Sequence, residues 1–265
     1  MKSIAHRKGL RAGFTLIELL VVISIIGILA GILLPALTKA KVAAKVAQSK
    51  TEIQGLKAAI DQYYSSYQRY PTSLSVRKEG VTTANPDYTY GTYGVTTPGN
   101  AAYAPKGAKM QMTIPTTASK IQTNNSEVVA ILMDQDRTIP NTPKKGHPEN
   151  RQGTAFLNAK AANNNTSPGV FVAGDGVYRD PWGSPYIISL DLNYDNSCRD
   201  GFYRGDRVAT DPKANSKGLN GFVKAERDGW EQRVGVMVWS MGPDKMADPT
   251  IAANTGVNKD NITSW

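Results

Sequence analysis

The feature that most constrains this chain is a run of 24 residues, Phe14 to Leu37, that contains a single charged side chain, Glu18. As an α-helix, a run of this length spans roughly 36 Å at about 1.5 Å per residue. The hydrocarbon core of a bilayer is about 30 Å thick, so the run is long enough to cross it. The residues before the run include four basic side chains and no acidic one: Lys2, Arg7, Lys8 and Arg11. Because positive charge that flanks a span tends to stay in the cytoplasm, this pattern predicts one crossing with residues 1–13 inside the cell.

Three interpretations of this N-terminus compete. A secretory signal peptide would have an apolar region of only about 7–15 residues and a cleavage site of small residues behind it. The run here is longer, carries an acid near its start and leads directly into another helical pattern. A plain membrane anchor explains the length but neither Gly13 nor Glu18. The third interpretation comes from Gly-Phe-Thr-Leu-Ile-Glu-Leu-Leu-Val-Val-Ile-Ser-Ile-Ile-Gly-Ile-Leu-Ala at positions 13–30, which closely resembles the N-terminus of the type IV prepilin family.

This resemblance implies a processing and assembly pathway. A prepilin peptidase would cut between Gly13 and Phe14 on the cytoplasmic side, and Phe14 would carry an N-methylated amino terminus. In a filament, Glu18 would pair with the amino group of Phe14 of a neighbouring subunit. An unpaired carboxylate in an apolar core is costly, and pairing with a cation removes much of that cost. The alternative is a carboxylate that only reaches the lipid headgroups.

The helical pattern continues beyond the apolar run. Between residues 38 and 67 there is no proline, and apolar side chains recur mostly at steps of three, four and seven: Val42, Val46, Ile53, Leu56, Ile60, Tyr63 and Tyr67. This pattern predicts one long helix from about Phe14 to Ser66, whose second half is covered by a later β-sheet. Pro35 removes one hydrogen bond and predicts a local kink. The helix should break near Tyr70, because Pro71 restricts the residue before it.

The rest of the chain predicts a small α+β head. Residues 72–123 are rich in turn-forming residues and predict loops with short strands, while 125–133 predicts a short helix that Asn125 or Ser126 can cap. The segment 180–186, Asp-Pro-Trp-Gly-Ser-Pro-Tyr, predicts a tight turn that feeds a strand. We expect that strand, over 186–192, to pair with a second one at 234–239, and Asn220-Gly221 to form a hairpin turn.

Three segments narrow the resemblance to one branch of the family. Arg69-Tyr70-Pro71-Thr72 at the helix end, the 180–186 turn and the C-terminus resemble the major (G-type) pseudopilin of type II secretion systems. In that comparison Trp182 packs the head against the helix. The usual pilin carries paired cysteines near its C-terminus, and this chain has only Cys198.

The C-terminal segment resembles the calcium loop of the pseudopilins. Ser-Met-Gly-Pro-Asp at 240–244 and Lys-Asp-Asn-Ile-Thr-Ser-Trp at 259–265 resemble the two ends of that loop. The resemblance implies calcium ligands at Asp244, Asp260 and Asn261, with carbonyl groups near Met241 and Asn258 completing the shell. Calcium needs six to eight oxygen atoms at about 2.3–2.6 Å. Two departures weaken the match. Asn261 stands where the family has a carboxylate, and the span from Asp244 to Asp260 is longer than in the family. Asp248 could compensate, and the alternative is a loop closed by turns and by packing of Trp265.

Composition excludes several classes of function. The formal charge is +9, and removal of the leader with its four basic residues leaves about +5, without a dense basic patch that would indicate nucleic acid. We find no nucleophile elbow, phosphate-binding loop, zinc-binding helix motif or cysteine pair, and His147 has no ligand partner at a suitable spacing. The sequence therefore favours a structural protein over an enzyme. A third class, a membrane-anchored binding module that never polymerises, would not need Glu18.

The combined hypothesis is an α+β, pilin-like subunit with five segments: leader 1–13, membrane or filament-core helix 14–37, amphipathic half 38–70, loop-rich insertion 71–179, and sheet region with calcium loop 180–265. The resemblance implies a single-pass inner-membrane protein with a periplasmic head, which forms a periplasmic helical homo-oligomer with minor pseudopilins and an inner-membrane assembly platform. Its function would be protein export by type II secretion. The alternative is a surface type IV pilin for adhesion, motility or DNA uptake.

Overall fold

The computed structural model describes residues 15–74, 76–80, 87–91, 109–110, 124–137, 143–211, 218–225 and 229–265. The chain divides into two compact units, Met1–Ala44 and Lys45–Trp265, and the helix α1 (Leu16–Tyr67) contributes to both. The other helices are α2 (Ser126–Leu132), α3 (Asp206–Ala209), a π-helical turn at Val76–Gly80 and 3₁₀ turns at Leu219–Gly221 and Gly256–Asp260.

A four-stranded antiparallel sheet organises the second unit, which we call the head. Its strands lie in the order β1 (Tyr88–Tyr90), β7 (Ile187–Leu190), β10 (Val236–Ser240) and β12 (Ile262–Thr263). Four two-stranded pairs surround it: β2 (Lys109–Met110) with β11 (Met246–Ala247), β3 (Gln135–Asp136) with β4 (Lys144–Lys145), β5 (Gly169–Val170) with β6 (Tyr178–Arg179), and β8 (Val223–Lys224) with β9 (Trp230–Glu231). The predicted pairing of the strands near 186–192 and 234–239 is confirmed, with Ser189 opposite Met237.

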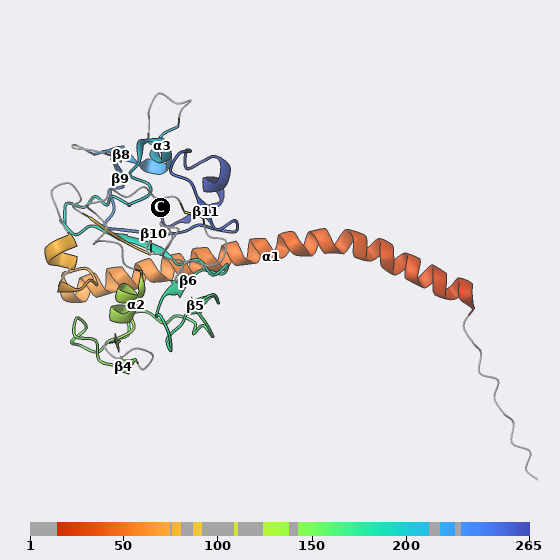
Figure 1. Cartoon of the computed structure of the whole chain (residues 1–265), viewed down its shortest axis with the longest axis horizontal. Coiled ribbons are helices and arrows are strands. Elements are labelled where there is room, and N and C mark those ends of the chain that lie inside the picture. The colour runs from red at the N-terminus through yellow and green to blue at the C-terminus, as the bar shows by residue number, and fades with distance from the viewer. Residues whose placement is uncertain are drawn as a thin grey trace, which may run out of the picture. The chain divides into compact units, whose positions relative to one another are not determined.

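The first core lies between α1 and one face of the sheet (Figure 1). The predicted helical stripe is buried there from Ile53 to Tyr63, with Ile53, Leu56, Ile60 and Tyr63 all at 0% exposure. Of its other members, Val46 and Tyr67 are partly buried against this core and Val42 is 40% exposed. The sheet contributes alternate residues to the same core: Ile188, Leu190, Val236, Val238 and Ile262. Burial of each such side chain contributes roughly 1.5–3 kcal/mol. The α+β architecture, a long N-terminal helix packed on a small antiparallel sheet, is thus confirmed.

A second core covers the opposite face of the sheet. Ile187, Met237 and Trp239 point into it, and they pack against aromatic residues from the segment after β7 and from the C-terminus: Phe202, Tyr203, Phe222, Trp230 and Trp265. Because both faces are covered, every residue of β7 and β10 is buried. Strands buried on both faces do not alternate between apolar and polar residues, which explains the weak alternation at 234–239.

Three local expectations need correction. The helix ends at Tyr67, one residue beyond the predicted end at Ser66 but before the break expected near Tyr70, because Gln68 already takes a left-handed backbone (φ 52°). The α2 helix is confirmed, but Asn125 does not cap it. The Asn125 side chain instead donates hydrogen bonds to the carbonyls of Tyr178 and Tyr186, at 2.9 and 2.8 Å. It thereby connects the start of α2 to β6 and to the residue before β7.

The third correction concerns Asn220-Gly221. Both residues have positive φ, 52° and 84°, and they form a turn. However, the β8 and β9 strands that pair as a hairpin begin after this turn, at Val223, so Asn220-Gly221 does not connect them. Asparagine and glycine tolerate left-handed backbone in any turn, and the dipeptide alone does not identify a hairpin.

The turn at 180–183 is confirmed, and its first residue links two parts of the sheet region. Asp180 is fully buried, and its Oδ1 accepts the N–H groups of Trp182 and Ser184 at 2.9 and 2.8 Å. Its Oδ2 accepts the hydroxyl of Ser240 at the end of β10, at 2.6 Å. Trp182 packs against the first core, and the ammonium group of Lys45 lies 6.0 Å from its ring. Burial raises the pKa of Asp180 to about 6, and these hydrogen bonds oppose the shift.

We predict that Asp180→Asn removes a pH-dependent loss of stability. Because the folded-state pKa lies above the unfolded value of about 3.9, the stabilisation from this group is complete below pH 4 and is lost as the pH rises through about 6. A shift of about two pKa units corresponds to roughly 3 kcal/mol. An asparagine keeps the acceptor for the turn and can donate to Ser240. Denaturant unfolding should show that the free energy of unfolding of the wild type falls by roughly this amount between pH 4 and pH 7.5. The same change of pH should not produce this fall in the variant, because asparagine does not ionise. Parallel pH profiles would contradict this assignment.

Candidate functional site

The first part of α1, from Leu16 to Leu37, exposes a largely apolar surface. The large apolar side chains from Leu16 to Leu37 are between 48% and 88% exposed, whereas the stripe further along the same helix is buried in the head. Of the described residues, this helix alone is long and apolar enough to cross a membrane. Its Gly27 and Gly31 have no atom within 4 Å of an added Cβ, so this face is open to a close neighbour. A surface of this size needs lipid or other helices to cover it.

A capping box closes the start of α1. Thr15 precedes the first helical residue, and its hydroxyl accepts the N–H of Glu18 at 3.3 Å. In return, Oε2 of Glu18 accepts both the N–H and the hydroxyl of Thr15, each at 2.8 Å. These bonds satisfy N–H groups that a helix start leaves without partners. Sequence reasoning missed this role of Thr15, although Thr-x-x-Glu before an apolar run is its signature.

The capping box does not use all of the bonding capacity of Glu18. Both bonds from Thr15 reach Oε2, and each carboxylate oxygen carries two lone pairs. The carboxylate can therefore keep its place at the helix start and still receive a cation. Gly13 and Phe14, the predicted cleavage site and the predicted partner of Glu18, lie outside the described residues.

The C-terminal loop brings two of its three predicted calcium ligands together. The N–H of Asp244 donates to Oδ2 of Asp260 at 3.3 Å. Gly242, at φ 68°, lies so close to the Asp260 carbonyl that an added Cβ would be 2.2 Å from it. The pKa of both carboxyls is raised, mainly by burial, and repulsion from Asp260 adds to the shift of Asp244. Two carboxylates held close together in this way favour a cation between them.

The side chain of the third predicted ligand, Asn261, contacts the second core. Its amide nitrogen donates to the hydroxyl of Tyr203 at 3.0 Å, while its Oδ1 is buried and has no partner among the described residues. The orphaned oxygen of Asn261 fits a hard cation that prefers oxygen ligands. Asp248, considered as a compensating ligand, turns its Oδ1 onto Thr250 instead. Trp265 packs in the second core, with its ring 5.1 Å from the ring of Tyr203. This packing agrees with the alternative to a calcium site, in which turns and Trp265 close the loop.

Other chemical groups in the described part of the chain have structural explanations. No three His, Cys, Asp or Glu side chains form a ready metal cluster within the described residues. The Nδ1 atom of His147 accepts the backbone N–H of Glu149, and the backbone N–H of His147 donates to the carboxylate of Asp134. His147 therefore organises a turn. Burial lowers its pKa.

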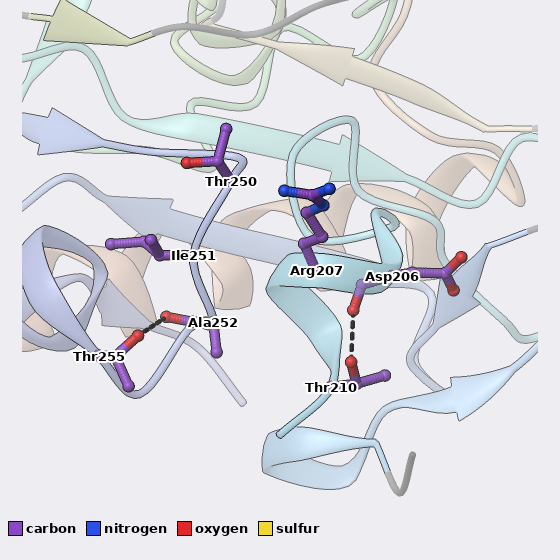
Figure 2. Close-up of a pocket in the computed structure, with 7 residues that line it drawn as sticks. All are labelled: Asp206, Arg207, Thr210, Thr250, Ile251, Ala252 and Thr255. Carbon is purple, nitrogen blue, oxygen red and sulfur yellow. Dashed lines mark hydrogen bonds between the residues drawn. The ribbon is translucent and has the colours of Figure 1, made fainter. Parts of the chain in front are cut away.

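An open pocket of about 460 Å³ lies between α3 and the C-terminal loop (Figure 2). Asp206, Arg207, Thr210, Thr250, Ile251, Ala252 and Thr255 line it. The hydroxyls of Thr210 and Thr255 are bonded to carbonyls of their own segments, and the indole of Trp230 donates to Asp206. None of the predicted site residues lines this pocket.

Comparison with known proteins bears on the N-terminus. Residues 9–34 match the family described as the prokaryotic N-terminal methylation motif. The protein is type IV prepilin-like at its N-terminus. This motif implies processing by a prepilin peptidase and assembly into a filament, and with the exposed apolar helix it indicates membrane anchoring. It is a structural motif and not an enzyme family. No curated protein and no solved structure matched the chain.

Proposed function

We propose that this protein is the structural subunit of a type II secretion pseudopilus. The observation that carries the proposal is the prepilin motif at residues 9–34 on a helix that exposes large apolar side chains from Leu16 to Leu37 and whose far end is built into a folded head. A helix with two such halves serves as an anchor before assembly and as a filament core after it. The protein acts through assembly and not as an enzyme.

Charge neutralisation sets the register of the subunits in this proposal. Cleavage between Gly13 and Phe14 creates a positive amino terminus, which pairs with Glu18 of the adjacent helix. The capping box already fixes the direction of the Glu18 carboxylate at the helix start. Apolar surfaces from Leu16 to Leu37 then cover one another, and contacts that do not close into a ring generate a helical fibre. Before assembly, the helix spans the inner membrane once, with the head in the periplasm.

The head supports the pseudopilus over a surface pilus. The turn at Asp180, with Trp182 packed on the first core, is the segment that resembles the major pseudopilin, and the C-terminal loop keeps two carboxylates together as its calcium site would. The partners in this machine are minor pseudopilins and the inner-membrane assembly platform. The N-terminal motif itself is common to pseudopilins and type IV pilins, so the pilus remains the alternative outcome of the test.

We predict that a strain lacking this chain loses extracellular proteins while its surface filaments stay unchanged, because the filament drives export. The measurement is the extracellular protein profile beside electron micrographs of the cell surface. Expression of the wild-type chain in the same strain should restore the profile. Loss of surface filaments with export intact would instead make this a type IV pilin.

We also propose that the C-terminal loop binds calcium through Asp244, Asp260 and Asn261. Calcium would neutralise the two close carboxylates and use the orphaned Asn261 oxygen, so it should raise the melting temperature of the full-length protein in detergent. Asp260→Asn should weaken the calcium dependence by about tenfold or more, since affinity follows the number of charged ligands. The assignment fails if Asp260→Asn and the wild type respond alike over millimolar calcium.

A further inference from the structure

Exposed lysines follow the apolar part of α1. Lys39 and Lys41 come two and four residues after Leu37, the last residue of the apolar run, and both side chains are exposed. The sequence has no acidic residue from Leu19 to Thr51. Because the helix continues through this segment without a break, its backbone carries both lysines at a defined distance from the end of the run.

The helix offers these two charges no counter-ion. Among the described residues, the ammonium groups of Lys39 and Lys41 make no hydrogen bond or ion pair. Oppositely charged side chains of a helix pair at a spacing of three or four residues. Lys57 makes such a pair with Asp61, at 3.0 Å. The positions three and four residues before and after Lys39 and Lys41 hold no acid, so an anion for these lysines has to come from another molecule.

The place of the lysines along the helix corresponds to the headgroup layer of a bilayer. With the apolar run in the hydrocarbon core, Lys39 and Lys41 lie roughly 3 and 6 Å beyond Leu37, at about 1.5 Å per residue. The polar layer on each side of the core is about 5–8 Å thick. Salt screens exposed charges only beyond about 8 Å at physiological ionic strength. Both ammonium groups are therefore within reach of lipid phosphates.

The two lysines lie on nearly opposite faces of the helix. At 3.6 residues per turn, positions 39 and 41 are about 200° apart around the axis. The large apolar side chains from Leu16 to Leu37 are likewise all exposed, by 48% to 88%. A single docked protein would cover one face of this helix, whereas lipid surrounds a helix on every side. The arrangement of the two charges therefore fits a lipid surface better than a docked protein.

We propose that Lys39 and Lys41 bind the phosphate groups of anionic phospholipids in the leaflet on the head side of the membrane. The inference rests on the proposed membrane-anchored state and names the lipid that this state contacts. Lysine stems can lie along an apolar surface while the ammonium group stays in the polar layer. Each ammonium group then donates hydrogen bonds to phosphate oxygens, and the anionic surface attracts the charge.

Processing makes this contact more important. Residues 1–13 carry four basic side chains, and all four are lost when the leader is removed. In the processed chain, the basic side chains next to the span are all on the head side. Basic residues close to an anionic membrane surface strengthen binding to it. The lysines therefore help to hold the processed subunit in the membrane until it assembles, and the contact is released when the helix enters the filament.

The experiment uses the unassembled, processed protein, identified by mass, in a neutral detergent. Phosphatidylglycerol and phosphatidylcholine are titrated separately, and native mass spectrometry gives the number of bound lipids and their dissociation constants. The test variants are Lys39→Gln, Lys41→Gln and the double variant, and Lys39→Arg combined with Lys41→Arg keeps both charges. The matched control is Lys50→Gln, because Lys50 is also exposed but lies roughly 20 Å beyond Leu37 along α1, outside the reach of the headgroups.

The wild type should bind phosphatidylglycerol more tightly than phosphatidylcholine. Each glutamine substitution at Lys39 or Lys41 should weaken phosphatidylglycerol binding about fivefold, and the double substitution about 25-fold, as expected for a lysine beside an anionic lipid surface. The double arginine variant and Lys50→Gln should bind like the wild type. The preference should shrink in high salt, which screens exposed charges. Inorganic phosphate should not compete, since it lacks the acyl chains that hold a headgroup beside the helix.

Equal affinity of the wild type for the two lipids, or a double glutamine variant that keeps the wild-type preference, overturns the proposal. Loss of filaments in that variant with unchanged lipid binding would assign the lysines to contacts between subunits instead. The titration contains no filament, so its result is independent of the machine in which the subunit works.

Discussion

The structure depends on how one helix satisfies two different environments. From Leu16 to Leu37 the helix exposes apolar side chains, and from Ile53 to Tyr63 the same helix provides the spine of a water-soluble core. A single carboxylate, Glu18, interrupts the apolar half, and it lies at the helix start, where the dipole and the capping box favour a negative charge. The cost of placing this charge in an apolar filament core is what makes a pairing partner necessary.

The head is built to hold that spine. One face of the four-stranded sheet packs on α1, and the other packs on an aromatic cluster from 202–230 and the C-terminus. Buried polar groups connect these layers: Asp180 joins the turn before β7 to the end of β10, and Asp200 accepts the hydroxyl of Ser189 and the indole of Trp239. The C-terminal loop holds the N–H of Asp244 against the carboxylate of Asp260.

The elements with strong local patterns could be predicted from the sequence. The apolar run and the stripe from Ile53 to Tyr63 predicted α1, and the β-prone runs predicted the pairing of β7 with β10. The second core could not be predicted, because Phe202, Tyr203 and Phe222 follow no helical or strand period in a polar, glycine-rich segment. The cap at Thr15 had a readable signature. The contact of Asp87 with the segment after β7, through the N–H of Arg199, had none, since only the β1–β7 register joins these distant segments.

The most direct test of the account compares Glu18→Gln with Thr15→Ala in assembled filaments. Glutamine keeps the capping box but removes the charge, whereas Thr15→Ala removes the threonine hydroxyl from the cap and keeps the charge. The measurement is the fraction of processed protein, identified by mass, that enters purified filaments. We expect Glu18→Gln to be processed between Gly13 and Phe14 yet to fall at least about tenfold in the filament fraction, since an unpaired amino terminus would be buried. Thr15→Ala should assemble nearly as well as the wild type. Assembly of Glu18→Gln at the wild-type level would contradict the account.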